Sequence, residues 1–402
     1  MAATIKESSL NNFMPKRNLV LSILSIAILI GVQLGCAAWA ATPSALSHLI
    51  SSQSQLAVLL YDGAKVCLVG IWDVQAMKYR QIEVTQVPTM FSGGWPNMIG
   101  FSPNGNYLAI EKVMTKGQNY MLPQPFYKSE VEIWDVQEEK FTVDCKIRGR
   151  VPVCISNSKV VATIPHQLTL VELLRQFVYE DTRIELVDAQ TGKVVAHCQP
   201  DKNRYLQSYT FYGRSGRFSP DGHQLAIAVS VSAGKNMESH DELRVYDAHT
   251  GKLSLTLPGS SIFCFSEDGK TLVTFSTKDG ICAWEVSSGK QIWSKQGYQA
   301  LGSQAIATGG DRVVAFGKLN QDSAEKAIHV FNLTTGEMIC TIKEAEEPVA
   351  LQLTDHGAKL VTAAHPYFKP IALETYDVDS GKATGAQSVF CDEIEQAWHL
   401  AP

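Results

Sequence analysis

Cysteine and histidine are the residue types in this sequence that could most readily bind a metal or take part in catalysis. Their spacing matches no known pattern for either role. The 402 residues include nine cysteines and ten histidines. They form no C-x-x-C, H-x-x-x-H or H-E-x-x-H pattern, so neither a zinc site nor a thioredoxin-type redox pair is indicated. The chain also lacks the G-x-S-x-G pattern of a nucleophile elbow. We therefore expect no catalytic, metal-binding or cofactor-binding residues.

Cys36 lies in an apolar N-terminal run, and the other eight cysteines are spread thinly over the rest of the chain, mostly inside apolar, strand-like stretches. This distribution favours small buried hydrophobic side chains over a disulfide framework. Cys145 and Cys154 are the one pair close enough in sequence to invite a bridge.

Exposed aromatic side chains offer a different kind of chemistry, because they are the residues that most often anchor protein interfaces. Two polar, irregular stretches carry such residues in this sequence. The candidate partner-binding residues are Tyr120, Phe126, Tyr127, Tyr367 and Phe368. Whether they can act together depends on the elements that position them.

Those elements follow from a pattern that recurs seven times: alternating residues ending in a large apolar or aromatic side chain, then an acid or amide. Such alternation is typical of a half-buried β-strand. The large residues are Trp72, Trp134, Val187, Tyr246, Trp284, Phe331 and Tyr376. In five copies a glycine stands four positions after the polar residue, namely Gly192, Gly251, Gly289, Gly336 and Gly381. Because glycine adopts a positive φ without steric cost, each is predicted to form a tight hairpin turn.

A second element precedes each copy, in which two apolar anchors stand seven residues apart around a short polar turn. It is clearest from Phe101 to Leu108, from Phe218 to Leu225 and from Phe265 to Leu272. Fainter copies run from Leu49 to Leu56, Ile306 to Val313 and Leu353 to Leu360, with a shorter one from Ile155 to Val160. Pro-Asp-Gly and Pro-Asn-Gly favour turns. Each repeat is therefore predicted to be two hairpins, which make one four-stranded antiparallel sheet.

The repeat resembles the WD40 repeat and its looser bacterial relatives among β-propellers over residues 45–390. In the best copy, Ser276, Asp279 and Trp284 look like three members of that family's hydrogen-bonding set, although Asp279 stands one residue closer to Trp284 than usual. The stretch 287–293, which ends in Trp293, is similar to the tryptophan-docking repeat of quinoprotein-like propellers.

The resemblance and the seven copies together predict an all-β fold, a seven-bladed β-propeller of four-stranded antiparallel blades over residues 42–402. One such sheet buries too little surface to be stable alone, and stacking gives each sheet two apolar neighbours. Residues 47–50 and 397–402 both suit the innermost strand of the first blade, and the sequence does not choose between them.

The spacing of the first hairpin is nearly constant among the repeats, and the large variation lies at one other place. From the second-strand anchor to the third-strand aromatic residue, the distance runs from 12 residues, Leu272 to Trp284, up to 26, Leu108 to Trp134. All these second-to-third connections emerge on one face of a propeller, which we take as the binding face. The inserts are residues 112–129, 234–241, 319–326 and 365–369, and the candidate aromatic residues lie in the first and last of them. In the alternative interpretation, these rings fold back onto their own blade edges.

The N-terminal segment indicates export. Residues 18–41 form an uncharged, largely apolar run, a hydrophobic helix by prediction, preceded by Lys16 and Arg17 at the end of a tail of residues 1–17. A basic flank before an apolar run identifies a signal peptide or a transmembrane anchor, with the tail in the cytoplasm. Both alternatives stay open. In either case the propeller is expected on the periplasmic or extracytoplasmic side, anchored to the cell membrane, or secreted if the signal is cleaved.

Composition supports a globular binding protein. The chain is 45% apolar and 19% charged with a net charge of −5, and its basic residues are scattered, so nucleic acid is not expected as a partner. We expect a non-catalytic scaffold that binds a protein, without cofactor. The alternative is a propeller enzyme of the quinoprotein-like or lactonase-like type, with a site at the central channel and carboxylates that hold Ca²⁺.

Overall fold

The computed structural model describes seventeen stretches of the chain, all within the compact unit Leu46–Pro402. They are residues 46–51, 55–61, 67–73, 78–84, 97–113, 128–148, 150–165, 184–198, 205–207, 216–233, 238–259, 262–276, 278–302, 305–320, 322–343, 348–364 and 371–389.

Nearly all regular structure in these stretches is β-strand, and the strands form seven antiparallel sheets in chain order. Sheet 1 contains β1 (Leu46–Ser51), β2 (Gln55–Tyr61), β3 (Cys67–Asp73) and β4 (Lys78–Val84). Sheet 2 contains β5 (Asn97–Phe101), β6 (Tyr107–Val113), β7 (Lys128–Asp135) and β8 (Lys140–Arg148). Sheet 3 contains β9 (Arg150–Ile155), β10 (Val160–Pro165), β11 (Ile184–Asp188) and β12 (Lys193–Cys198).

Two of the remaining four sheets have a divided first strand, so that they contain five strands. Sheet 4 contains β13 (Tyr205–Gln207), β14 (Gly216–Phe218), β15 (Gln224–Ala233), β16 (Glu238–Asp247) and β17 (Leu253–Pro258). Sheet 5 contains β18 (Phe263–Phe265), β19 (Thr271–Ser276), β20 (Gly280–Glu285) and β21 (Gln291–Lys295). Sheet 6 contains β22 (Gln299–Ala300), β23 (Ile306–Gly309), β24 (Arg312–Lys318), β25 (Ala327–Asn332) and β26 (Met338–Ile342). Sheet 7 contains β27 (Pro348–Thr354), β28 (Lys359–Ala364), β29 (Ile371–Asp377) and β30 (Ala383–Val389), with a 3₁₀ turn at Asp355–Gly357.

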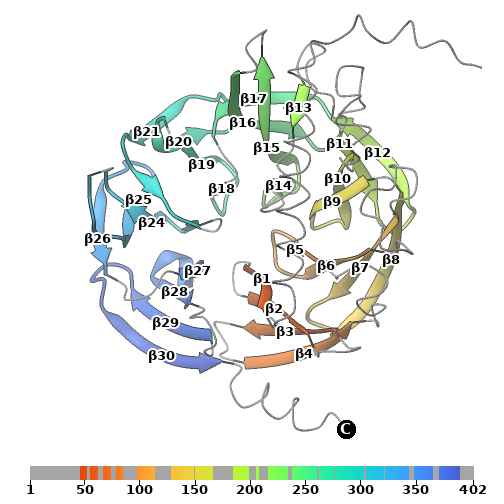
Figure 1. Ribbon diagram of the computed structural model, residues 1–402, viewed down its shortest axis with the longest axis horizontal. Coiled ribbons are helices and arrows are strands. Elements are labelled where there is room, and N and C mark those ends of the chain that lie inside the picture. The colour runs from red at the N-terminus through yellow and green to blue at the C-terminus, as the bar shows by residue number, and fades with distance from the viewer. Residues whose placement is uncertain are drawn as a thin grey trace, which may run out of the picture. The chain divides into compact units, whose positions relative to one another are not determined.

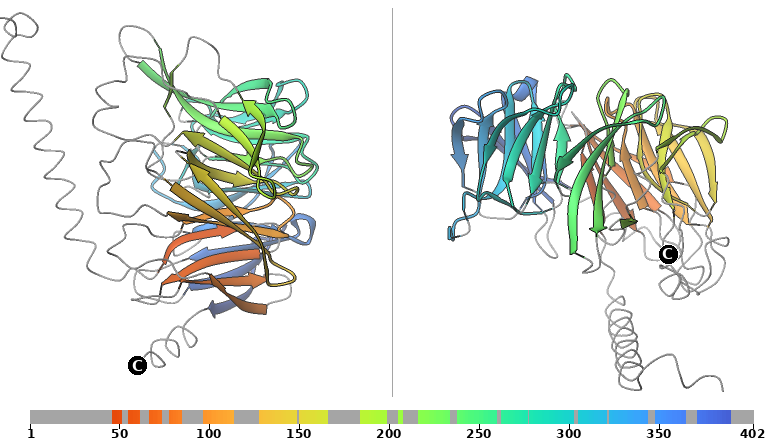
Figure 2. Two further views of the ribbon diagram at one scale, coloured as in Figure 1. Left: turned by 90° about the vertical axis from the view of Figure 1, so that its right-hand side faces the viewer. Right: turned by 90° about the horizontal axis from the view of Figure 1, so that it is seen from above.

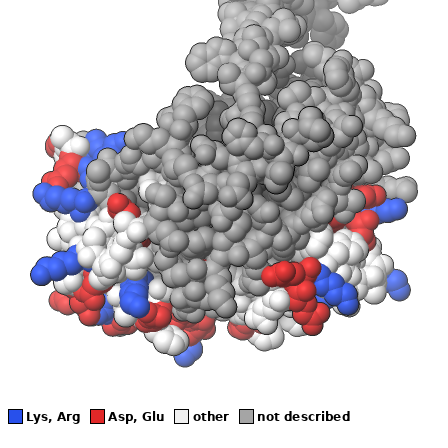
Figure 3. All heavy atoms as spheres, turned by 90° about the horizontal axis from the view of Figure 1, so that it is seen from below, with Lys and Arg blue, Asp and Glu red and all other residues white. Residues whose placement is uncertain are grey.

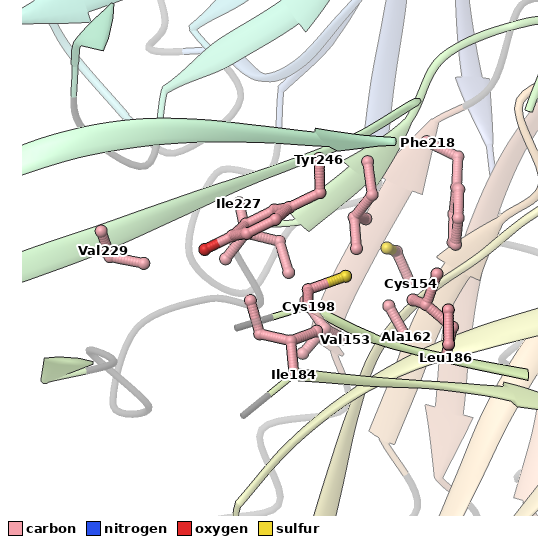
Figure 4. Close-up of a cluster of buried hydrophobic side chains, with 12 residues drawn as sticks. Val153, Cys154, Ala162, Ile184, Leu186, Cys198, Phe218, Ile227, Val229 and Tyr246 are labelled. Atoms are coloured by element: carbon pink, nitrogen blue, oxygen red, sulfur yellow. The ribbon is translucent and has the colours of Figure 1, made fainter. Parts of the chain in front are cut away.

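Within this unit each sheet packs face to face on the next one along the chain (Figure 1). Six clusters of buried apolar side chains lie between successive sheets, from sheets 1 and 2 to sheets 6 and 7. Figure 4 shows the cluster between sheets 3 and 4, where Val153, Cys154 and Leu186 face Phe218 and Tyr246. The first strands of sheets 1 and 7 are also in contact. Four-stranded antiparallel sheets that pack in this way are the building plan of a β-propeller.

The predicted hairpins are present where the structure describes them. The five repeat glycines have φ between 66° and 70°. Sheet 2 lacks the glycine, and Glu139 adopts a φ of 51° at the equivalent position. In sheets 2, 3, 4, 6 and 7 the polar residue at the start of this turn accepts backbone N–H groups of the turn. In sheet 4 the backbone N–H and the hydroxyl of Thr250 both donate to Asp247, which lowers the pKa of that carboxyl. Turn chemistry was therefore readable from the sequence.

The structure shows which segment forms the innermost strand of sheet 1. Strand β1 includes residues 47–50 and pairs with β2, so the N-terminal candidate forms the innermost strand of sheet 1. The competing residues 397–402 lie outside the described residues, as do residues 1–45 with the tail and the hydrophobic segment. Among the residues that the structure describes, none forms a helix long and apolar enough to cross a bilayer.

Trp293, the last residue of the stretch that resembles a tryptophan-docking repeat, is buried between sheets 5 and 6. The Trp293 indole Nε1 donates to the Leu333 carbonyl oxygen over 2.7 Å. The ring lies 6.3 Å from that of Phe331, centroid to centroid, and it covers Gly336 so closely that a Cβ on this glycine would lie 2.6 Å from Trp293 Cδ2. Glycine at this position therefore provides both a positive φ and room for the indole.

The prediction that Ser276, Asp279 and Trp284 share one WD40-like set of hydrogen bonds is wrong for Trp284. Ser276 and Asp279 do interact, with Oγ and Oδ2 3.3 Å apart, but they form the short turn between β19 and β20. The Trp284 indole Nε1 donates instead to Thr274 Oγ1 over 2.9 Å. Because Asp279 stands one residue too close to Trp284, it belongs to the turn, and the indole meets the hydroxyl two residues earlier on the neighbouring strand.

The cysteines behave as buried apolar side chains, as the sequence predicts. Five of the six cysteines whose burial is described are buried, and none of the six forms a disulfide. The bridge that Cys145 and Cys154 invite is absent, because they belong to clusters on opposite sides of sheet 3. Burial raises the pKa of Cys145 to about 11 and that of Cys198 to about 12. These thiols are therefore poor nucleophiles at neutral pH.

Candidate binding face

The antiparallel order of the strands gives the assembled sheets two opposite faces. We call the face with the first-to-second and third-to-fourth strand turns, such as 102–106 and 188–192, the turn face. The face with the second-to-third connections, such as that between β15 and β16, and with the connections between sheets is the loop face.

The turn face is joined from sheet to sheet by hydrogen bonds. The backbone N–H of Asn104 donates to Asn157 Oδ1 over 3.0 Å, and Asn157 Nδ2 donates to the Pro220 carbonyl over 2.8 Å. His356 Nδ1 lies 3.7 Å from Glu267 Oε2, so the turn of sheet 7 reaches the turn of sheet 5 past the short turn of sheet 6. A Cβ on Gly310 would lie 1.9 Å from the His356 carbonyl. The turns are fitted to one another, which leaves their backbone little freedom.

The innermost strands offer little chemistry. None of β1, β5, β9, β14, β18, β23 and β27 contains an aspartate or glutamate. The described side chains of β18 and the segment Leu351–Leu353 are buried, while Arg217 of β14 is exposed. Within the described ranges, no group of three or more His, Cys, Asp or Glu side chains gathers closely enough to hold a metal ion. These strands therefore lack the carboxylates with which a channel-centred site would bind Ca²⁺.

All five candidate aromatic residues lie outside the described residues: Tyr120, Phe126, Tyr127, Tyr367 and Phe368. Strand β6 ends at Val113 and β7 begins at Lys128, so the largest insert connects these two strands as expected. Their role as partner-binding residues stays a prediction.

Part of one insert is regular structure. Residues 238–241 of the predicted insert 234–241 belong to β16, which pairs with β15 over ten residues each, from Gln224 opposite Asp247 to Ala233 opposite Glu238. Strand β13 pairs with the outer part of β15, where Tyr205 lies opposite Ser232. In Figure 2, right, this hairpin reaches beyond the ends of the neighbouring strands. Alternating residues in 224–233 and 238–247 could have revealed this pairing, since such alternation is the signal of paired strands.

A buried ion pair lies at the base of this hairpin. Arg244 is completely buried and donates through Nε and Nη2 to Glu242 Oε2, over 3.2 Å and 3.1 Å. Both residues alternate with Leu243 and Val245, so they share with Tyr246 the side of β16 that faces sheet 3. Arg244 Nη1 is buried without a hydrogen-bond partner. Sequence reasoning missed this pair, because two charges two residues apart in a strand are ordinarily solvated.

A second polar network crosses sheet 3 toward the loop face. Arg150 Nε lies 3.1 Å from Glu185 Oε2 and donates to Thr163 Oγ1 over 3.0 Å. His197 Nδ1 lies 3.8 Å from the other Glu185 oxygen. Four successive strands, β9 to β12, each contribute one of these side chains. At its loop-face end, sheet 3 is therefore held together by an ion pair and hydrogen bonds. The clusters between the sheets consist of apolar side chains instead.

Charged side chains of both signs are mixed over the described surface in Figure 3. The described ion pairs outside sheets 3 and 4 are largely exposed, for example Lys343 and Glu325 at 2.7 Å. Exposed pairs contribute little to stability. No sign of charge dominates this surface.

Comparisons with known proteins return structural likeness alone. No family model matches the chain, and no curated protein sequence matches it. Among solved structures, the computationally designed Ika8 protein is similar with 13% identity and a TM-score of 0.49, over 86% of this chain and 87% of that chain. The β-propeller domain of Cps50 (Swd1) from Myceliophteria thermophila is similar with 15% identity and a TM-score of 0.48, over 87% and 98%.

A chain of a mitotic checkpoint complex is similar with 13% identity and a TM-score of 0.46, over 79% of this chain and 84% of that chain. At such identities and scores, the assignment of the fold rests on the sheet topology of the protein itself. The sheets and their packing define a β-propeller class of protein.

Proposed function

We propose that this protein is an exported, membrane-associated, non-catalytic propeller of the WD40-like type that binds a protein partner through its loop face. Its seven sheets are seven blades of a closed ring, in which the contact between β1 and β27 completes the circle. The hydrophobic segment 18–41 carries the propeller to the extracytoplasmic side and, if it is not cleaved, holds it at the membrane.

The contrast between the two faces carries this proposal. On the turn face, the described hairpins repeat one geometry and are joined by hydrogen bonds such as Asn104 to Asn157. On the loop face, the connections differ in length from sheet to sheet, and in sheet 4 the strands themselves are extended. A scaffold that repeats on one side and varies on the other is typical of repeat proteins that bind through the variable side.

The lack of carboxylates on the innermost strands supports binding rather than channel-centred catalysis. Two of the polar side chains buried in sheets 3 and 4 make their hydrogen bonds within the fold, since Arg244 donates to Glu242 and Thr163 donates to the Glu185 carbonyl. These contacts favour a structural role for both side chains.

The test is crosslinking of the full-length protein in membranes, followed by affinity capture. One variant replaces residues 231–240 by Asn-Gly, which shortens the β15–β16 hairpin and keeps its base. A second variant shortens the 112–129 insert. The matched control, Lys193→Glu, alters an exposed residue on the turn face. We expect at least one loop-face variant to lose a partner that the control retains. Equal capture by all three, or loss with the control alone, contradicts the proposal.

A further inference from the structure

The distal half of β16 is a strand edge with no neighbour among the described residues. Strand β17 pairs with β16 only as far as Pro258, which lies opposite Glu242. Strand β16 continues for four more residues, to Glu238. The next residue, Gly259, lies so close to sheet 5 that an added Cβ would stand 3.4 Å from the Cβ atoms of both Leu243 and Thr274, and the chain continues from there to sheet 5. The edge at residues 238–241 is therefore uncovered by β17.

The direction of the backbone groups at this edge follows from the turn at the other end of β16. The N–H of Asp247 donates to the Lys252 carbonyl, on the β17 side, and the N–H of Ala248 donates to the His223 carbonyl, on the β15 side. The register of β16 with β15 has no shift from residue 238 to 247, so this alternation persists along the strand. Ser239 and Asp241 therefore direct their N–H and C=O groups outward.

A β-bulge is a common device against unwanted strand pairing, and none disturbs this part of β16. The register between third and fourth strands shifts at the equivalent position, close to the turn face, in each of sheets 2 to 7. In sheet 4 the shift lies between Val245 and Tyr246, and the pairing of β16 with β15 is regular from residue 238 to residue 247.

The charge of residues 238–241 indicates which kind of added strand could pair with this edge. Residues 238–241, Glu-Ser-His-Asp, contain two acids and neither lysine nor arginine, and Asp241 is exposed. Opposite charges on paired antiparallel strands stabilise the pairing, and like charges oppose it. The strand is also held in place, by β13 on the far side of β15 and by the buried Arg244–Glu242 pair at its base.

From these observations we propose that the distal edge of β16 binds an extended, basic segment of a protein partner by strand addition, with main-chain hydrogen bonds to Ser239 and Asp241. The inference rests on the proposed function and specifies it: the partner contributes a strand with lysine or arginine side chains. Main-chain pairing provides affinity in such complexes, and side chains provide specificity.

The test uses a fluorescein-labelled peptide of alternating lysine with threonine or valine, eight residues long, and the full-length protein in detergent. Two control peptides carry glutamate in place of lysine, or N-methyl groups at alternate backbone positions. Fluorescence anisotropy gives each dissociation constant. We expect binding of the lysine peptide only, and hydrogen-exchange protection of the Ser239 and Asp241 amides upon binding.

Ser239→Pro removes one outward N–H and places a ring in the path of the added strand, while Ser239→Ala keeps the N–H. We expect about a tenfold weaker lysine-peptide affinity for the proline variant, roughly the value of one hydrogen bond, and no change for the alanine variant. Asp241→Lys provides a second measure without proline and should weaken binding further. Circular dichroism melts check that each variant is folded.

Failure of the lysine peptide to bind, equal binding of the glutamate peptide, or insensitivity to both Ser239→Pro and Asp241→Lys overturns the strand-addition inference. Crosslinked partner capture by the loop face would be unaffected by that result, so the proposed function and this inference fail separately.

Discussion

The close fit of Gly336 beneath Trp293 allows a prediction from two glycines that share a backbone conformation. Gly336 and Gly192 end equivalent turns in sheets 6 and 3, with φ of 70° and 68°. A Cβ at Gly192 would meet nothing within 4 Å, whereas one at Gly336 would lie 2.6 Å from the indole. Alanine at the two positions therefore introduces the same backbone strain and differs only in the contact with Trp293.

The expected magnitudes follow from these two contributions. Forcing an alanine into the left-handed region costs roughly 1–2 kcal/mol, so Gly192→Ala should lower the free energy of unfolding by about that amount. Crowding in a packed site adds typically 1–3 kcal/mol, so Gly336→Ala should cost about 2–5 kcal/mol in total. The indole cannot simply withdraw, because its N–H is bound to the Leu333 carbonyl.

Urea unfolding followed by circular dichroism measures both variants, with Trp293→Leu and the double variant Trp293→Leu with Gly336→Ala to complete a cycle. In the leucine background, the cost of Gly336→Ala should fall to that of Gly192→Ala. Equal destabilisation by the two glycine variants in the parent protein would refute the reasoning, because the indole would then exert no constraint on position 336.

Three further predictions concern single side chains. Burial lowers the pKa of His329, an effect that the charge of Glu325 opposes, so the native protein binds fewer protons than the unfolded chain. The free energy of unfolding should therefore fall as the pH drops below about 6.5, the unfolded value, and His329→Gln should flatten this part of a urea-midpoint profile. Thr274→Val leaves the buried Trp284 N–H without its acceptor and should cost about 1–3 kcal/mol in urea unfolding, more than Ser276→Ala; the reverse order would restore the WD40-like set. Burial raises the pKa of Cys264 to about 11, so this thiol should resist Ellman's reagent at pH 8 in the native protein and react in urea, as peptide mapping by mass spectrometry would record.

Local sequence determined the repeating unit of this protein. Asp247 followed by Gly251 specifies a turn, because the carboxylate accepts the N–H groups of the next residues and glycine alone adopts the positive φ cheaply. Phe218-Ser219-Pro220-Asp221-Gly222 does the same for the first hairpin. Such signals act over five residues, so they can be read without any knowledge of neighbours in space.

Tertiary structure decided which of these residues meet. The partner of the Trp284 indole depended on a shift of one residue, and only the pairing of β19 with β20 placed Thr274 beside it. The Arg244–Glu242 pair is buried because sheet 3 covers it, which no pattern within β16 reveals. The outward edge at Ser239 exists because β17 ends at Pro258, opposite Glu242, whereas β16 extends four residues farther. Alternation along a strand is a local property, whereas burial and pairing depend on segments far apart in the chain. The sequence alone therefore defined the repeating sheets, and the fold defined their surfaces.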